Sequence, residues 1–136
     1  KRKHPIQVFT QRGVSGIDGL ISTGAGIAYA QKNKIAIVLG DLSFLYDING
    51  LYFLKKNTCN VDIFVLNNNG GRIFETLPIS KDSIFESLFV MPHHLSMKHS
   101  ALQFGLDYMQ VSTYHAFKNL EKGEALKSRL IEVILK

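Results

Sequence analysis

Short apolar runs alternate along the chain with longer stretches whose apolar residues recur at helical spacing. Residues 34–40 contain a continuous apolar run after Lys34, typical of a strand buried on both faces of a parallel sheet, and residues 61–66, apolar apart from Asp62, are the next predicted buried strand. Residues 16–32 and 43–56 have the spacing of helices, and Ser43 is the predicted N-cap of the second helix. The pattern therefore predicts strand–helix–strand units in the first half of the chain.

The alternation continues, less regularly, through the second half. A short first strand is also predicted over 7–10. In the second half, the pattern predicts strands over 107–111 and 129–135. It predicts helices over 83–90, 96–104 and 112–122, the last capped by Gly123. This order of elements, with short links, predicts one α/β domain over residues 1–136. Its sheet is expected to be mostly parallel, with right-handed crossovers and helices on both faces.

Composition narrows the class of protein. The 136 residues are 46% hydrophobic and 20% charged, which is ordinary for a globular chain and excludes collagen-like, low-complexity and disordered classes. Cys59 is the single cysteine, which excludes an intramolecular disulfide and a multi-cysteine metal site, and suits a reducing cytoplasm. The apolar runs are much shorter than the ~20 residues of a membrane span. We therefore expect a cytoplasmic protein without a membrane span.

The net charge of +5 comes from basic residues that are mostly scattered, apart from residues 1–3 and the pair Lys55 and Lys56. Nucleic-acid-binding proteins usually gather such residues on one stripe, often with aromatic residues between them. The sequence therefore predicts no nucleic-acid partner. A modest positive field still favours anionic ligands.

Polar residues follow two of the predicted strands. Asp41 comes directly after the run 34–40, and the segment Asn67-Asn-Asn-Gly-Gly71 follows the run 61–66. If these strands are neighbours, their carboxyl ends lie ~4.8 Å apart, and open α/β sheets bind ligands at that edge. A carboxylate of Asp41, a side-chain carbonyl of Asn68 and a backbone carbonyl of Gly70 are oxygen donors of the kind that Mg²⁺ prefers.

The residues alone leave a second interpretation open. Asp41 could simply cap a helix, and the run of Asn and Gly could form a tight turn. If the residues do form a metal site, a helix that begins near Ser43 directs its free N–H groups toward the carboxyl edge of the strands, where they would suit a phosphate.

A family resemblance favours the metal site. Gly40-Asp41, followed some two dozen residues later by Asn67-Asn68, resembles the signature of thiamine-diphosphate enzymes. More specifically, three blocks and a following Leu77-Pro78 resemble the 2-succinyl-5-enolpyruvyl-6-hydroxy-3-cyclohexene-1-carboxylate (SEPHCHC) synthases of menaquinone biosynthesis: Arg12-Gly-Val-Ser-Gly-Ile-Asp-Gly19, Gly40-Asp-Leu-Ser-Phe-Leu-Tyr-Asp-Ile-Asn49 and Asn67-Asn-Asn-Gly-Gly-Arg-Ile-Phe74. The resemblance weakens after about Pro92.

The resemblance implies roles for particular residues. It implies a thiamine-diphosphate-binding fold in which Mg²⁺ or Mn²⁺ is held by Asp41, Asn68 and Gly70. The cofactor would be contacted by Ile17, Leu42, Ser43, Asn68 and Ile73, and the substrates by Arg12, Ile73, Phe74 and Leu77. The histidines receive no catalytic role: His93 and His94 are expected in a loop, and His99 and His115 on the outer faces of helices.

The resemblance also implies an activity for a longer parent enzyme. That family is a transferase, a carboligase that decarboxylates 2-oxoglutarate and adds the resulting succinyl-semialdehyde unit to isochorismate. Its activating glutamate lies in another domain of a partner subunit, in a homodimer or tetramer. The chain therefore looks like most of the last of three domains, trimmed of its first strand and helix. It would hold no catalytic residue of its own, and we expect the isolated chain to be inactive.

Two other functions stay open on the sequence. One is a different thiamine-diphosphate carboligase or decarboxylase, such as a relative of acetolactate synthase. The other is a non-catalytic α/β module that binds a phosphate, although the sequence has neither a P-loop nor a Gly-x-Gly-x-x-Gly segment after a strand.

Overall fold

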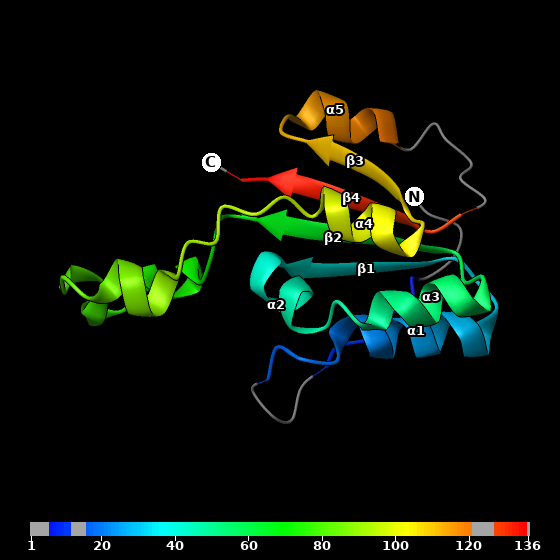
Figure 1. The fold of residues 1–136 in the computed structure, drawn as a ribbon, viewed down its shortest axis with the longest axis horizontal. Coiled ribbons are helices and arrows are strands. Elements are labelled where there is room, and N and C mark those ends of the chain that lie inside the picture. Colours follow the sequence, from blue (N-terminus) through cyan, green and yellow to red (C-terminus); the bar gives the residue numbers. More distant parts are fainter. Residues whose placement is uncertain (1–5, 12–15, 121–126, 136) are drawn as a thin grey trace.

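The computed structural model describes residues 6–11, 16–120 and 127–135, and its centre is one parallel sheet (Figure 1). The strands lie in the order β1-β2-β4-β3, and all neighbours are parallel. Their bounds are Ile35–Gly40 for β1, Val61–Asn67 for β2, Asp107–Val111 for β3 and Arg129–Ile134 for β4. The predicted α/β fold with a parallel sheet is confirmed, and four of the five predicted strands form within one residue of their expected bounds.

Helices cover both faces of the sheet, as predicted. On one face, the main core joins the inward side chains of the strands to α1 (Leu20–Gln31), α2 (Asp41–Tyr46), α3 (Gly50–Asn57) and α4 (Lys98–Phe104). On the other face, a smaller core forms under α5 (Tyr114–Asn119). The period-2 alternation of strands explains this division, since neighbouring residues of one strand face opposite sides of the sheet.

Strand β1 is buried on one face only, and not on both faces as predicted. Ile37 and Leu39 point into the main core, but Val38 on the opposite face is 65% exposed. On the same face, the ring of Phe64 in β2 packs against that of Phe117 in α5, with 6.0 Å between centroids. Strand β1 lies at the edge of the sheet next to β2, so α5 covers the far half of this face and leaves β1 open.

The prediction of a single helix over residues 43–56 is wrong. The structure has two helices, α2 and α3, and Ser43 lies inside α2 rather than at its N-cap, which is Gly40. The break follows from a tertiary contact: the carboxylate of Asp47 accepts hydrogen bonds from the N–H (2.7 Å) and hydroxyl (2.8 Å) of Ser22 in α1. Gly50 then allows α3 to approach α1 closely, because a Cβ there would lie 2.9 Å from the backbone N of Ser22.

Other predicted bounds need correction. Residues 7–10 form no strand, and the helix predicted from residue 16 begins at Leu20, after Gly19 in a left-handed conformation. The helices predicted over 96–104 and 112–122 are shorter, as α4 and α5, and the predicted cap Gly123 lies outside the described residues.

The segment between residues 72 and 90 contains short helical turns instead of the regular helix predicted over 83–90. Two 3₁₀ turns, η1 (Arg72–Thr76) and η2 (Pro78–Lys81), precede a π-helical turn, η3 (Glu86–Val90). Figure 1 shows this segment extending away from the carboxyl edge of the sheet. Within the described part of the chain, no helix has the length and apolar character that crossing a membrane requires.

A buried ion pair stabilises the opposite, amino-terminal edge of the sheet. Asp62 in β2 and Arg129 in β4 are partners in register, and Arg129 donates to both carboxylate oxygens at 2.8 and 2.6 Å. Lys34 adds a contact to Asp62 at 3.0 Å. Burial alone would raise the pKa of Asp62, but the hydrogen bonds and charges of Arg129 and Lys34 outweigh it and hold the pKa below its usual value.

This shift predicts a pH dependence of stability. A carboxyl group with a lowered pKa stabilises the folded state above its unfolded pKa of about 3.9, and this contribution disappears as the pH falls through the folded pKa. We expect Asp62→Asn to lose about 3 kcal/mol of unfolding free energy near neutral pH, because Arg129 is left without its partner. The loss should shrink as the pH falls below about 4.

Urea unfolding at a series of pH values measures both effects. The matched control is Asp107→Asn, which removes an exposed carboxylate opposite Arg129 in β3 and should change stability little. Equal losses for the two variants, or a loss for Asp62→Asn that does not depend on pH, would contradict the prediction.

Candidate functional site

Asp41 and Gly70 meet at the carboxyl edge of the sheet. Strands β1 and β2 are parallel neighbours with Gly40 opposite Leu66, so the residues that follow each strand emerge side by side. Asp41 is only 2% exposed, and its Oδ2 accepts the backbone N–H of Gly70 at 2.9 Å. The structure therefore brings together two of the three residues predicted to hold a metal.

The remaining hydrogen bonds of Asp41 fix the orientation of its carboxylate. Oδ1 accepts the backbone N–H of Leu42 at 2.7 Å, and Oδ2 has a second contact with Nε2 of His93 at 3.1 Å. An ionised carboxylate has about four acceptor positions, of which these contacts use three. Within the described residues, these contacts leave one acceptor position on Oδ1 unused.

His93 is the site residue that the sequence analysis missed. It does lie in a loop, as expected, but its side chain is 10% exposed and reaches Asp41. Its Nδ1 accepts the N–H of Leu95 at 2.9 Å, so a neutral imidazole with its proton on Nε2 satisfies both contacts. The two residues are 52 positions apart, and no local pattern signals such a contact. His99 and His115 are exposed on helices, as expected.

The loop after β2 has a backbone conformation that requires its glycine. Gly70 has φ of 126°, and a Cβ there would lie 2.2 Å from the carbonyl oxygen of Val90. The next residue, Gly71, donates its N–H to that same oxygen at 2.7 Å. The loop therefore sits directly on the end of η3, with no space for a side chain between them.

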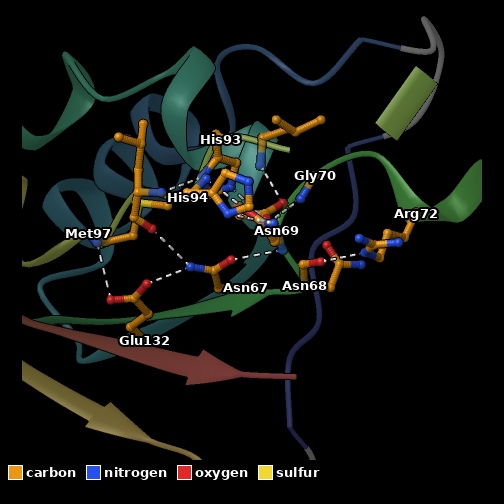
Figure 2. Close-up of polar contacts among 12 residues, drawn as sticks. Asn67, Asn68, Asn69, Gly70, Arg72, His93, His94, Met97 and Glu132 are labelled. Carbon is orange, nitrogen blue, oxygen red and sulfur yellow. Dashed lines mark hydrogen bonds and ion pairs between the residues drawn. The ribbon is translucent and has the colours of Figure 1, made fainter. Parts of the chain in front are cut away.

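Asn69 also has a left-handed backbone, with φ of 63°. Its side chain accepts the N–H of His94 at 2.8 Å, and its own N–H donates to Oδ1 of Asn67 at 3.0 Å (Figure 2). These bonds hold the backbone on either side of Asn68. The backbone carbonyl of Asn68 in turn accepts Nε of Arg72 at 2.8 Å.

An open pocket lies beside this loop. Its volume is about 730 Å³, and it is lined by Asn68, Asn69, Arg72, Ile73, Glu75 and Leu135. The pocket contains Asn68 and Ile73, which were both predicted to contact a cofactor. Arg72 is held there by Glu75 at 2.6 Å and Glu86 at 3.4 Å.

The other predicted residues lie in different places. Ile73, Phe74 and Leu77 are 76%, 37% and 46% exposed on and just after η1. Ile17 precedes α1 and is 38% exposed, whereas Arg12 lies outside the described residues. The N–H of Leu42, expected to meet a diphosphate, donates to Asp41 in this structure.

The donor atoms suit a hard divalent cation. Gly70 accepts one hydrogen bond, from the N–H of Arg72 at 3.0 Å, and its carbonyl keeps a second acceptor position. The side-chain oxygen of Asn68, which lines the pocket beside the loop, would complete a set of three oxygen donors with Asp41 and Gly70, and such a set suits Mg²⁺ and not a soft metal. No cluster of three or more His, Cys, Asp or Glu side chains that could hold a metal occurs among the described residues.

Comparison with known proteins gives one consistent family name. Over 136 residues the chain is 40% identical to the SEPHCHC synthase of Chlorobium phaeovibrioides, which matches 98% of this chain but 23% of that protein. The synthases of Vibrio atlanticus and Pasteurella multocida are 41% and 46% identical over 132 and 107 residues. The chain spans between 19% and 23% of the length of these three curated relatives. No protein-family profile matches it.

Solved structures share the fold at lower identity. A thiamine diphosphate-dependent 4-hydroxybenzoylformate decarboxylase from Rhodococcus jostii superimposes with a TM-score of 0.71 at 24% identity, covering 83% of this chain and 22% of that one. The benzoylformate decarboxylase of Polynucleobacter necessarius gives 0.72 at 19% identity, covering 85% and 23%. These similarities are of fold alone.

The loop geometry predicts a strong effect of one methyl group. Gly70→Ala forces a side chain into the space next to Val90 and into an unfavourable φ, and we expect it to lower the unfolding free energy by more than about 2 kcal/mol. Gly26→Ala in α1 is the control, since its Cβ meets nothing within 4 Å, and it should leave stability unchanged or raise it. Denaturant unfolding compares them, and a tolerated Gly70→Ala would show that the loop has another conformation.

Proposed function

We propose that this chain, which resembles a fragment of the SEPHCHC synthases, is the segment of such an enzyme that binds Mg²⁺ and the diphosphate of thiamine diphosphate. The observation that carries the proposal is the contact between Asp41 and Gly70 at the ends of two parallel strands. Identities of 40% and 46% to synthases of that name support it, because matches that cover 98% and 79% of this chain span the positions of Asp41 and Gly70.

The metal would be held by Asp41, the side-chain oxygen of Asn68 and the carbonyl of Gly70. Oδ1 of Asp41 and the carbonyl of Gly70 each keep an acceptor position in the hydrogen-bond network described above, so binding to them need not break the contacts that hold the loop. Mn²⁺ also accepts this donor set. Leu42 and Ser43, in the first turn of α2, would lie next to the diphosphate, with Ile17 and Ile73 against the rest of the cofactor.

The proposed substrates are those of the whole enzyme, 2-oxoglutarate and isochorismate. When bound, thiamine diphosphate would supply the chemistry that decarboxylates 2-oxoglutarate and transfers the resulting succinyl-semialdehyde unit to isochorismate. Ile73, Phe74 and Leu77 would provide apolar surface beside the pocket, and their exposure leaves them free to contact a ligand or another part of the enzyme. Arg12 would bind a substrate carboxylate through its guanidinium.

In this proposal the segment supplies half of an active site. The acid that activates the cofactor belongs to another domain of a partner subunit in a homodimer or tetramer, in the cytoplasm. The chain alone should then give no product, because the partner's activating acid would be missing and one side of the cofactor would face water.

Removing the only carboxylate from the metal site tests the proposal. In the intact enzyme that contains this segment, Asp41→Asn should weaken binding of Mg²⁺ and thiamine diphosphate by more than about tenfold, because the cation loses its one anionic protein ligand. Titration calorimetry measures the affinity. The control Asp107→Asn removes one negative charge at the opposite edge of the sheet and should bind normally.

The thermal stability of both variants is recorded beside the affinity, since Asp41 also holds Gly70 and His93. Wild-type affinity in a folded Asp41→Asn enzyme would remove Asp41 from the site. Tighter binding of ATP than of thiamine diphosphate by the wild type would favour a phosphate-binding module instead.

The role of Arg12 leads to a separate expectation. Arg12→Ala in the intact enzyme should raise the KM for a carboxylate substrate or lower kcat, while the affinity for thiamine diphosphate stays the same, because the guanidinium would contact substrate and not cofactor. Arg12→Lys keeps the charge but loses the two-pronged geometry, so it should restore activity only in part. Loss of cofactor binding in Arg12→Ala would place the residue at the diphosphate.

A further inference from the structure

Glu132 is a buried carboxylate that the proposed site does not use. It lies in β4 within the apolar segment RLIEVI and is 1% exposed, pointing into the side of the sheet covered by α4. A carboxylate in such a place is costly unless donors surround it. Its position opposite Val65 sets it close to the carboxyl end of β2, where the loop with Asn68 and Gly70 begins.

The donors to Glu132 divide between its two oxygens. Oε2 accepts from the hydroxyl of Tyr108 at 2.5 Å, the hydroxyl of Ser96 at 3.1 Å and the N–H of Met97 at 3.2 Å. Oε1 accepts from Nδ2 of Asn67 at 2.6 Å. Burial, and then the hydrogen bond to Glu132, raise the pKa of Tyr108, which keeps its phenol a donor. Oε2 of Glu132 therefore binds donors from strand β3 and from the segment before α4, and Oε1 binds the residue at which the loop begins.

The amide of Asn67 is oriented mainly by the short contact with Glu132 at 2.6 Å, and Nδ2 of Asn67 has a second, longer contact with the carbonyl oxygen of Leu95 at 3.4 Å. Figure 2 shows the resulting chain: Glu132 accepts from Nδ2 of Asn67, and Oδ1 of Asn67 accepts the N–H of Asn69 at 3.0 Å. If the amide were turned over, Nδ2 would face the N–H of Asn69, and two donors would oppose each other. An acceptor at Glu132 thus holds Asn67 in the orientation that stabilises the left-handed Asn69.

We propose that Glu132 is a positioning residue for the divalent-cation site: by orienting the amide of Asn67 it fixes the backbone between Asn67 and Gly70, and with it the placement of Asn68 and Gly70 as ligands. The inference rests on the proposed function for the identity of the ligand. Its structural part, the control of the loop by Glu132, does not depend on the cofactor.

The geometry predicts that Glu132→Gln cannot satisfy all its neighbours. If the new amide nitrogen faces Asn67, two donors oppose each other there. If it faces the other way, it opposes the N–H of Met97, which then has no acceptor. We expect the variant to exchange the backbone amide hydrogens of residues 67–71 faster in the metal-free enzyme. Its affinity for Mg²⁺ with thiamine diphosphate should fall by about tenfold or more, the usual effect of losing a residue that orients a metal ligand.

The double variant Asn67→Asp with Glu132→Gln reverses the hydrogen bond between these two residues and keeps the link to Asn69, while the carbonyl oxygen of Leu95 loses its longer contact of 3.4 Å with Nδ2 of Asn67. Asp at 67 still accepts the N–H of Asn69, and Gln at 132 donates to it while its carbonyl faces Met97, Ser96 and Tyr108. Loop exchange and metal affinity should therefore return toward wild type, with slower exchange and tighter binding than in either single variant. Asn67→Asp alone places two carboxylates together where the wild-type atoms are 2.6 Å apart, and it should be impaired in both measurements.

Tyr108→Phe separates positioning from general destabilisation. It removes a donor from Oε2 of Glu132 but leaves the contact with Asn67, so it should lower thermal stability without changing loop exchange or metal affinity. The intact enzyme is used throughout, with hydrogen exchange and calorimetry on each variant. If Glu132→Gln fails to fold, the double variant against the wild type decides the question.

Three results would overturn the proposal. They are wild-type loop exchange in Glu132→Gln, a folded double variant that is no better than Glu132→Gln, and a loop effect in Tyr108→Phe equal to that in Glu132→Gln. A wild-type enzyme that binds no Mg²⁺ with thiamine diphosphate would instead refute the proposed function. The exchange data on the metal-free enzyme would still confirm or overturn the role of Glu132 in the loop.

Discussion

A carboxylate buried at the end of a strand needs hydrogen-bond donors, and at Asp41 these come from three separate parts of the chain. The N–H of Leu42 is local, that of Gly70 comes from the loop after β2, and Nε2 of His93 comes from the segment after η3. Because Asp41 is almost fully buried, none of these contacts can be exchanged for water without cost. The conformation of the loop and the path of the chain back to the sheet both depend on this group.

The two edges of the sheet use buried charge differently. At the amino-terminal edge, Asp62 is neutralised by cationic side chains: Arg129 donates to both of its oxygens, and Lys34 lies 3.0 Å from one of them. At the carboxyl edge, Asp41 and Glu132 have no cationic side-chain partner of that kind within the described residues, and are satisfied mainly by N–H and hydroxyl donors. Negative charge that is held in place but not neutralised by an ion pair is what a divalent cation requires.

Much of this arrangement could be predicted from the sequence because it follows from local pattern. The apolar runs give the strands, and parallel strands bring Asp41 and the loop with Gly70 to one edge. The roles of His93 and Glu132 could not be predicted, since each depends on a contact with a residue 52 or 65 positions away. The division of the helix over 43–56 likewise follows from a contact between Asp47 and Ser22, which no helical periodicity contains.

The central claim is that Asp41, Asn68 and Gly70 hold one divalent cation at the carboxyl edge of the sheet. A crystal structure of the intact enzyme with thiamine diphosphate and Mn²⁺, with the cation located by its anomalous scattering, tests this most directly. The account predicts a single peak within about 2.2 Å of oxygen atoms of all three residues and of the diphosphate. A cation bound elsewhere, or an Asp41 that keeps only its present contacts while the cofactor is bound, would contradict it.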